Sequence, residues 1–228
     1  SRKASSTSML IIPLPNRNKV IDPFFGLERT SKILDRLTDP WGRPYDPTDM
    51  QLTLLNSRAR NQIWLMGRRA GKSTTAAIKA ILTLLKPRKL IWVVAPTYAL
   101  AEKIFRVIYD ISVRCLSYMI EGKPRYSKDE MSIHFKTGSR LLCYTAKNLT
   151  NLVGDSIDLL ITDESGDMPN MAIELMAPAL TDINPMTGRA KGQFIAVGTP
   201  RTHNWYKEYY DLGKQEYVEE TTEEMLRR

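Results

Sequence analysis

The chain has 228 residues, of which 43% are apolar and 25% charged, and its formal net charge at pH 7 is +8. This length suffices for one sizeable hydrophobic core, and the chain contains no uncharged apolar run of about 18 residues that could span a membrane. Its two cysteines, Cys115 and Cys143, lack the spacing of a metal site. We therefore expect buried free thiols in a reducing cytosol and no membrane association.

The charge is distributed unevenly along the chain. Residues 50–101 contain nine lysines and arginines and neither Asp nor Glu, whereas residues 214–228 contain five glutamates. A basic block of this kind either binds an anionic partner or solubilises a surface. Nucleic acid is one candidate for such a partner.

Residues 1–47 are rich in proline and predict an irregular arm that packs on the core. A short helix is expected over residues 27–37, and Trp41 and Tyr45 are expected to anchor the arm. Prolines interrupt the apolar stretch that follows the basic start, which argues against a signal peptide.

A helical segment with Leu52, Leu54 and Leu55 follows, and Gln51 lies at its start. An amide side chain both donates and accepts hydrogen bonds. Gln51 could therefore read the edge of an adenine base, since it lies shortly before a phosphate-binding loop. An exposed helix residue without such a role is an equally compatible interpretation.

The stretch from Gly67 to Thr74 has the pattern of a phosphate-binding loop. It follows the apolar run 63–65, which predicts a buried strand, and it precedes a helix-like segment over 75–82. Backbone N–H groups and the positive end of a helix dipole favour an anion at such a turn. Lys72 is expected to neutralise phosphate oxygens, and Ser73 is expected to ligate Mg²⁺. The predicted nucleotide contacts cover the whole loop: Gly67, Arg68, Arg69, Ala70, Gly71, Lys72, Ser73 and Thr74.

The loop departs from the usual pattern at its first glycine, which is replaced here by Met66. A glycine-capped turn at the start of an ordinary helix is the alternative interpretation. Arg68 and Arg69 are either solvated charges or further phosphate ligands, and a loop that binds an anion favours the second role.

The next segments predict two further structures. Residues 90–95 are continuously apolar, which is typical of a strand covered on both faces. A long helix is expected after Tyr98, and its inner face is marked at steps of three and four residues by Leu100, Ile104, Val107, Ile108, Ile111, Cys115 and Met119. The alternation in 131–135 and the return over 140–144 predict a β-hairpin.

Residues 157–162 predict another buried strand, which ends in Asp163 and Glu164. Successive strand residues point to opposite faces, so the two carboxylates can serve different roles. Asp163 is expected to hold Mg²⁺, and Glu164 is expected to orient or deprotonate an attacking water. Because a central strand directs its carboxyl end to the ligand crevice of an α/β sheet, both acids are expected to meet Lys72 there.

A third buried strand over 194–197 leads to Thr199, whose hydroxyl is placed to sense the γ-phosphate. A simple turn residue before Pro200 is the alternative. Buried strands that alternate with helices predict an α/β fold with a mainly parallel central sheet flanked by helices.

In this order, the motifs make the chain resemble the ATPase domain of the large terminase subunit of tailed bacteriophages. The resemblance runs from about Asp46 to Leu212, and the replacement at Met66 is common in this family. It rests on Gln51, the arginine-containing loop 67–74, residues 94–98, the Asp163-Glu164 pair, residues 198–201 and residues 203–205.

The resemblance implies a RecA-like (ASCE) P-loop NTPase that hydrolyses ATP with Mg²⁺ and moves double-stranded DNA into a procapsid. It further implies a homo-oligomeric ring on the portal protein, a small terminase subunit as partner, and action in the host cell cytoplasm. It divides the chain into an N-terminal arm (1–47), an ATPase core (48–213) and the acidic start (214–228) of a linker to a nuclease domain that this chain lacks.

Within this resemblance, Thr199 would couple hydrolysis to movement of the DNA. Relatives often carry an arginine, proposed to reach a neighbour's ATP, at the position that Val153 occupies here, so we assign no trans-acting arginine there. Arg68 or Arg69 could act in cis beside Lys72 on the transferred phosphoryl group, and the looser candidates are Arg125, Arg140, Arg189 and Arg201.

Three other functions use similar motifs. A helicase of the related group would need a second RecA-like domain, for which the chain has no room. A small-molecule kinase is disfavoured because the Asp163-Glu164 pair suits water as the nucleophile. A nucleotide-binding scaffold that does not hydrolyse ATP is the alternative from a different class.

Overall fold

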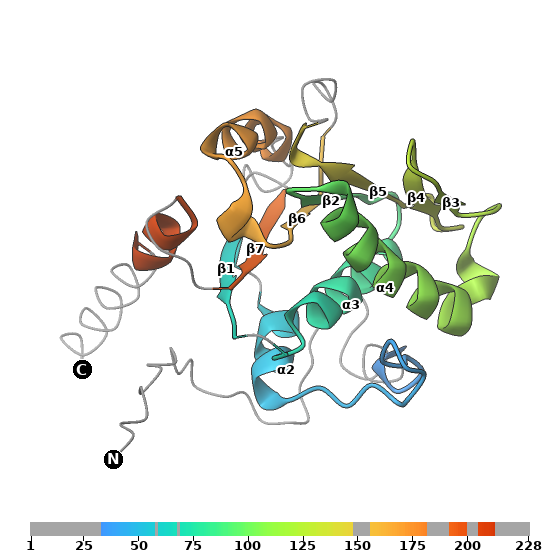
Figure 1. Ribbon diagram of the computed structural model, residues 1–228. Helices are drawn as coiled ribbons and strands as arrows, with labels where there is room; N and C mark the ends of the chain where they lie inside the picture. Colours follow the sequence, from blue (N-terminus) through green and yellow to red (C-terminus); the bar gives the residue numbers. More distant parts are fainter. Residues whose placement is uncertain are drawn as a thin grey trace, which may run out of the picture.

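The computed structural model describes residues 33–57, 59–67, 69–147, 156–181, 192–199 and 205–212. A seven-stranded sheet forms its centre (Figure 1), with the strand order β1-β7-β6-β2-β5-β4-β3. The pairs β1–β7, β7–β6, β6–β2 and β2–β5 are parallel, while β5–β4 and β4–β3 are antiparallel. The strands are β1 (Asn61–Leu65), β2 (Leu90–Ala95), β3 (Arg125–Tyr126), β4 (Met131–His134), β5 (Arg140–Thr145), β6 (Leu159–Thr162) and β7 (Gln193–Gly198).

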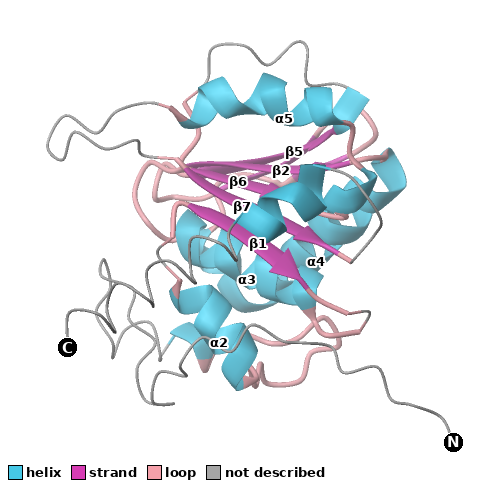
Figure 2. Cartoon of the chain, turned by 90° about the vertical axis from the view of Figure 1, so that its left-hand side faces the viewer, coloured by secondary structure: helices cyan, strands magenta, loops and turns pink. Residues whose placement is uncertain are grey.

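Helices cover both faces of this sheet, as Figure 2 shows. One face carries α2 (Asp49–Asn56), α3 (Lys72–Leu84) and α4 (Tyr98–Leu116). The other carries α5 (Asn170–Met176) and the helical residues 205–212. Short 3₁₀ turns are η1 (Ser117–Met119), η3 (Ser165–Asp167) and η4 (Ala177–Leu180). The predicted α/β fold with a mainly parallel, helix-flanked sheet is confirmed.

The side chains of β2 explain why its sequence is apolar without a break. Ile91 and Val93 join the core cluster beneath α3 and α4, whereas Trp92 and Val94 join the cluster beneath α5. Neighbouring strand residues point to opposite faces, so a strand covered on both sides needs an apolar residue at every position. Burying one side chain of this size contributes ~1.5–3 kcal/mol.

The long helix after Tyr98 is α4, and Thr97 caps its start by accepting a hydrogen bond from the N–H of Leu100 (3.4 Å). Its buried residues are Ala101, Ile104, Phe105, Ile108, Ile111, Ser112 and Leu116. The predicted inner face is therefore correct for its three isoleucines. The other predicted positions on α4 are only partly buried, and Met119 lies beyond the helix in η1.

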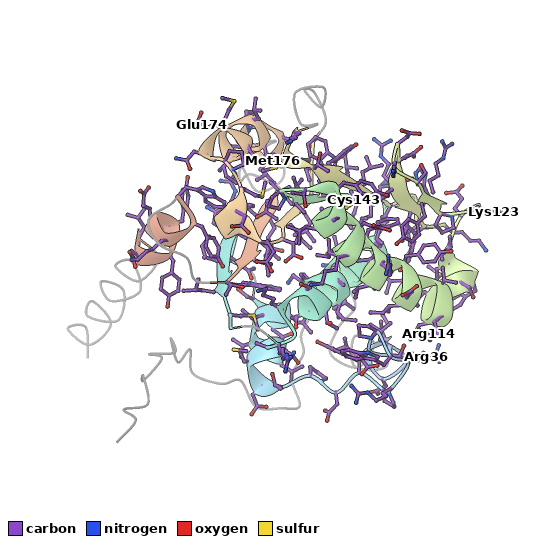
Figure 3. All side chains as sticks on the ribbon, in the orientation of Figure 1. Arg36, Arg114, Lys123, Cys143, Glu174 and Met176 are labelled. Atoms are coloured by element: carbon purple, nitrogen blue, oxygen red, sulfur yellow. The ribbon has the colours of Figure 1, made fainter. Side chains whose placement is uncertain are left out.

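The predicted hairpin is formed by β4 and β5, which place Met131 opposite Cys143 and His134 opposite Arg140. Cys143 lies at the buried side of β5 (Figure 3) and donates from Sγ to the carbonyl oxygen of Ala101 in α4 (3.5 Å). Both cysteines are free thiols, as the sequence predicts, but only Cys143 is buried, whereas Cys115 is partly exposed.

The N-terminal arm is described only from residue 33, so most of its predicted helix lies outside the described residues. Leu34 and Leu37 are buried, and Tyr45 packs partly buried against the same cluster. The prediction that Trp41 anchors the arm is wrong, because this side chain is 77% exposed. Arg43 lies over its ring at 5.2 Å from the centroid instead.

The turn that exposes Trp41 is held from within. The carboxylate of Asp39 accepts hydrogen bonds from the backbone N–H groups of Trp41 and Arg43 (2.9 Å each). The same carboxylate also binds Nε of Arg43 at 2.7 Å.

Within the described ranges, no helix combines the length and the apolar character needed to cross a bilayer.

Candidate active site

The phosphate-binding loop joins β1 to α3, although Arg68 within it lies outside the described residues. Gly71 has a φ of 76° and Arg69 a φ of 64°. The left-handed backbone at Gly71 favours glycine, and a Cβ there would also lie 2.4 Å from Nε2 of Gln51, so the amide of Gln51 would have to move. Gly71 is the N-cap of α3 and offers no capping side chain, which leaves the first N–H groups of the helix available to an anion.

Gln51, near the start of α2, contacts this loop through its side chain. Its side-chain nitrogen donates to the carbonyl oxygen of Ala70 (3.3 Å), and its side-chain oxygen accepts from the N–H of Thr48 (2.9 Å). Thr48 in turn caps α2 by accepting from the N–H of Gln51, which completes a capping box. Gln51 therefore already positions the loop, and its predicted contact with adenine stays a prediction.

The acidic pair follows β6 directly, and a sharp turn separates the directions of the two carboxylates. Asp163 is buried and donates its backbone N–H to the carbonyl oxygen of Val94 (2.9 Å). Glu164 adopts the left-handed conformation with a φ of 49°. Ser165 fixes this turn, because its hydroxyl lies 2.9 Å from the carbonyl oxygens of both Thr162 and Val197.

The strand order brings the separate motifs to one place. Since β7 lies between β1 and β6, Thr199 at its end stands between the phosphate-binding loop and the acidic pair. The Nζ atom of Lys72 lies 3.3 Å from Oε1 of Glu164 and donates a hydrogen bond to Oγ1 of Thr199. The Ser73 hydroxyl contacts the two oxygens of the Asp163 carboxylate at 3.3 and 3.5 Å. The structure thus brings together five predicted site residues from three segments.

Burial dominates the electrostatics of Asp163. Desolvation raises the pKa of this carboxyl to about 6, and the neighbouring charge of Glu164 acts in the same direction. Lys72 and the Ser73 hydroxyl oppose the rise without cancelling it. A buried carboxylate beside a second carboxylate and a serine hydroxyl is a set of hard oxygen donors, which is the chemistry that Mg²⁺ prefers.

Sequence reasoning missed the contacts of Tyr206. Its hydroxyl donates to the carbonyl oxygen of Trp64 in β1 (2.9 Å), and its ring lies against Gly198, where a Cβ would approach the ring to 3.1 Å. Desolvation raises the pKa of Tyr206 above its ordinary value. The adjacent Trp205 donates from its indole nitrogen to the carbonyl oxygen of Met168 (3.0 Å). Two consecutive aromatics after Thr199 were the only signal in the sequence.

Two of the arginines considered for a trans-acting role, Arg125 and Arg140, lie within the described residues. Arg125 lies on β3 and pairs with Glu130 (2.8 Å), and Arg140 begins β5 at the amino end of the strand. Val153, Arg189 and Arg201 lie outside the described residues. Among the residues that the structure does describe, no group of three or more His, Cys, Asp or Glu side chains could hold a metal.

No protein-family model matches the chain. Curated relatives do match, and they are phage proteins. The large terminase subunit of Thermus virus P23-45 is 25% identical over 184 residues, which cover 74% of this chain and 37% of that protein. The large terminase subunit of Escherichia phage T5 is 28% identical over 173 residues, or 73% of this chain and 37% of the relative. The chain thus spans little more than a third of the length of these relatives.

Solved structures show the same likeness. The large terminase ATPase domain of Thermus phage P74-26 superposes with a TM-score of 0.62 at 25% identity, over 85% of this chain and 74% of that domain. The large terminase of bacteriophage HK97 shares the fold, with a TM-score of 0.59 at 17% identity over 75% of this chain and 37% of that one. The resemblance drawn from the motifs and the RecA-like P-loop fold that it implies are confirmed.

Proposed function

We infer that this chain is the ATPase domain of a tailed-phage terminase large subunit, and that the crevice at the ends of β1, β6 and β7 binds and hydrolyses ATP. The observation that carries the inference is the meeting of Lys72 with Glu164 at 3.3 Å, beside Thr199. A cation, a carboxylate and a hydroxyl from three strand ends form the arrangement that phosphoryl transfer to water requires. The relatives named large terminase subunits support the same inference.

In the proposed mechanism, the loop from Gly67 to Thr74 encloses the phosphates, and the N–H groups at the start of α3 face them. Lys72 exchanges its contacts with Glu164 and Thr199 for β- and γ-phosphate oxygens. Arg68 or Arg69 adds positive charge to the transferred phosphoryl group. Gln51 recognises the adenine edge while its other contacts hold the loop.

Ser73 and Asp163 are the residues that would hold Mg²⁺, since their oxygens already lie within 3.3 Å of each other. When bound there, the ion neutralises charge on the β- and γ-phosphate oxygens. Asp163 must be ionised for this role. Its buried position keeps the charge close to the phosphates and away from solvent.

Glu164 orients the attacking water and accepts its proton, because the turn after β6 directs this carboxylate toward Lys72 rather than into the core. When phosphate oxygens bind the ammonium group of Lys72, they displace the Glu164 carboxylate from it. Thr199 lies against the same ammonium group, so its position depends on whether a phosphate is present. We propose that Thr199 thereby couples hydrolysis to movement.

The motor role belongs to the longer protein. By analogy with terminases, the domain would move double-stranded DNA without sequence preference into a procapsid. It would work as a homo-oligomeric ring on the portal with a small terminase subunit, in the host cell cytoplasm. DNA contacts of this kind are made to phosphates by Lys and Arg, so they weaken as salt rises.

Steady-state ATP turnover of the 228-residue chain, with and without duplex DNA, tests this function. We expect slow hydrolysis, because an arginine supplied by a neighbouring subunit can contribute about 10³–10⁵ in rate. A longer version that restores the remaining terminase sequence should hydrolyse faster, and duplex DNA should raise its rate further. Binding of ATP without turnover in either version would instead identify a nucleotide-binding scaffold.

A further inference from the structure

The basic block of residues 50–101 divides between two ends of the sheet. Lys72 serves the candidate active site, and Lys79 donates to the carbonyl oxygens of Leu55 and Ser57 at the end of α2 (2.8 and 3.2 Å). Three other charges of the block, Lys86, Arg88 and Lys89, precede β2 and lie at the amino ends of the parallel strands. A six-residue strand is about 20 Å long, so a nucleotide at the carboxyl ends does not account for them.

The turn between β4 and β5 adds further positive charge at this end. Arg140 pairs with Leu90 in the β2–β5 ladder, and its N–H donates to the carbonyl oxygen of Lys89 (2.9 Å). The N–H of Arg88 donates to the carbonyl oxygen of Thr137 (3.0 Å). We call the resulting group of five basic residues the basic platform: Lys86, Arg88, Lys89, Lys136 and Arg140.

Side-chain hydroxyls lock the two loops of the basic platform together. Thr137 donates to the carbonyl oxygen at the end of α3, on Leu84 (2.7 Å), and the Ser139 hydroxyl accepts from the N–H of Lys89 (2.8 Å). Arg88 has a φ of 51°. A residue with a Cβ adopts this conformation only where its surroundings impose it, as these bonds do. A surface fixed in this way loses little conformational entropy on binding.

The members of the basic platform differ in whether their side chains already have a partner. Lys89 pairs with Asp158 (2.6 Å), and Lys136 donates to the carbonyl oxygen of Tyr118 (2.8 Å). Arg88 and Arg140 are exposed, and neither guanidinium forms a hydrogen bond or an ion pair with any other residue in the described part of the chain. The planar guanidinium presents parallel N–H donors that match two phosphate oxygens.

We propose that the basic platform binds the phosphate backbone of double-stranded DNA, with Arg88 and Arg140 as the main contacts. This inference rests on the proposed function, because it names the surface that grips the substrate of the motor. Contacts to phosphates carry no sequence information, which suits a domain that must hold successive stretches of DNA. The DNA would then lie at the amino ends of the parallel strands and the nucleotide at their carboxyl ends, and β2 runs from one end to the other.

The test measures binding of the full 228-residue chain to a fluorescent duplex of mixed sequence across a range of salt concentrations. The double variant Arg88→Asn/Arg140→Gln removes both charges, and asparagine tolerates the left-handed backbone at position 88. A matched control, Lys103→Gln/Lys128→Gln, removes two exposed charges near the carboxyl ends of the strands. Thermal unfolding of all three proteins checks that each is folded.

We expect the platform variant to bind more weakly at low salt. Its plot of log K against log salt should be shallower by about 1.8, since each phosphate contact contributes about 0.9 to the slope. The control should keep the slope of the unaltered chain. Equal slopes for the platform variant and the unaltered chain, or a larger loss in the control, would overturn this inference alone. Failure of the unaltered chain to bind duplex at all would overturn the proposed DNA role as well.

Discussion

Asp163 meets two opposing demands within one side chain. It is buried at the end of β6, which favours the neutral acid, yet its proposed role as a Mg²⁺ ligand requires the carboxylate. Lys72 and the Ser73 hydroxyl favour the charged form, but the pKa still rises to about 6. The residue therefore changes its charge just below neutral pH, and this makes its role measurable.

Mg²⁺ binding should weaken in acid. With a pKa of about 6, Asp163 is mostly ionised at pH 7 and mostly protonated at pH 5, so the apparent Mg²⁺ affinity of the nucleotide complex should fall by about tenfold between them. Calorimetric titration with Mg²⁺ at several pH values measures this change. Asp163→Asn should bind Mg²⁺ weakly at every pH. A pH-independent affinity in the unaltered chain would contradict the assignment.

The same shift sets the sign of a stability effect in the absence of Mg²⁺. A carboxyl whose pKa is raised on folding binds its proton more tightly in the folded state. Its contribution is present below the ordinary pKa of 3.8 and is lost as the pH rises through about 6. Relative to Asp163→Asn, the unaltered chain should thus become less stable over this interval.

At this scale, sequence reasoning found the residues whose chemistry is local. Lys72, Ser73 and the acidic pair lie in short motifs next to predicted strands, so their meeting could be anticipated. Ser165 could not be found in this way, because its hydroxyl acts through the carbonyl oxygen of Val197, 32 positions along the chain. Gln51 was assigned to adenine, whereas its contact with the loop carbonyl of Ala70 depends on how α2 packs.

At the scale of elements, the helical residues 205–212 contact the segments that carry the motifs of the site. Tyr206 reaches β1 through the carbonyl oxygen of Trp64 and lies against Gly198 in β7. Trp205 reaches the segment after Glu164 through Met168. One dipeptide therefore touches the three segments that carry the phosphate-binding loop, Thr199 and the acidic pair.

Tyr206→Phe keeps the ring and removes the hydroxyl, which leaves the carbonyl oxygen of Trp64 buried without this donor. We expect a loss of about 1–3 kcal/mol in the free energy of unfolding, measured by urea denaturation. Tyr209→Phe, on the same helix but 46% exposed, should change stability by less than about 0.5 kcal/mol. Equal effects of the two substitutions would show that the buried bond contributes nothing.

The elements themselves were largely predictable, because buried strands and an amphipathic helix leave periodic patterns. Their limits were less so. The run from residue 157 predicted a longer strand than β6, which begins at Leu159. The two residues before β6 form other bonds. The N–H of Ile157 donates to the carbonyl oxygen of Ala179. The carboxylate of Asp158 accepts from the N–H of Leu90 and from Nζ of Lys89. The apolar character of Trp41 predicts burial, but the side chain is exposed because Asp39 accepts a hydrogen bond from its N–H and fixes the turn at the surface.

At the scale of the whole molecule, the strand order decides which motifs meet, and no motif encodes that order. Placing β7 between β1 and β6 brings Thr199 to the ammonium group of Lys72, beside Glu164. The same order places β2 beside β5. The loops that precede these two strands, about 50 positions apart in the sequence, therefore meet at the amino ends of the strands and form the basic platform. In the proposed motor, one end would respond to the nucleotide while the other would hold the DNA.

We propose that Glu164 activates water on a nucleotide held by Lys72. The most direct test is to measure ATP turnover and ATP binding of Glu164→Gln on the same sample. Glutamine keeps the size of the side chain and a contact with Lys72 but cannot accept the proton. The dissociation constant for ATP should stay within about threefold of the unaltered chain, while hydrolysis should fall by about 10²–10⁴. Turnover at the unaltered rate, with ATP still bound, would contradict the account.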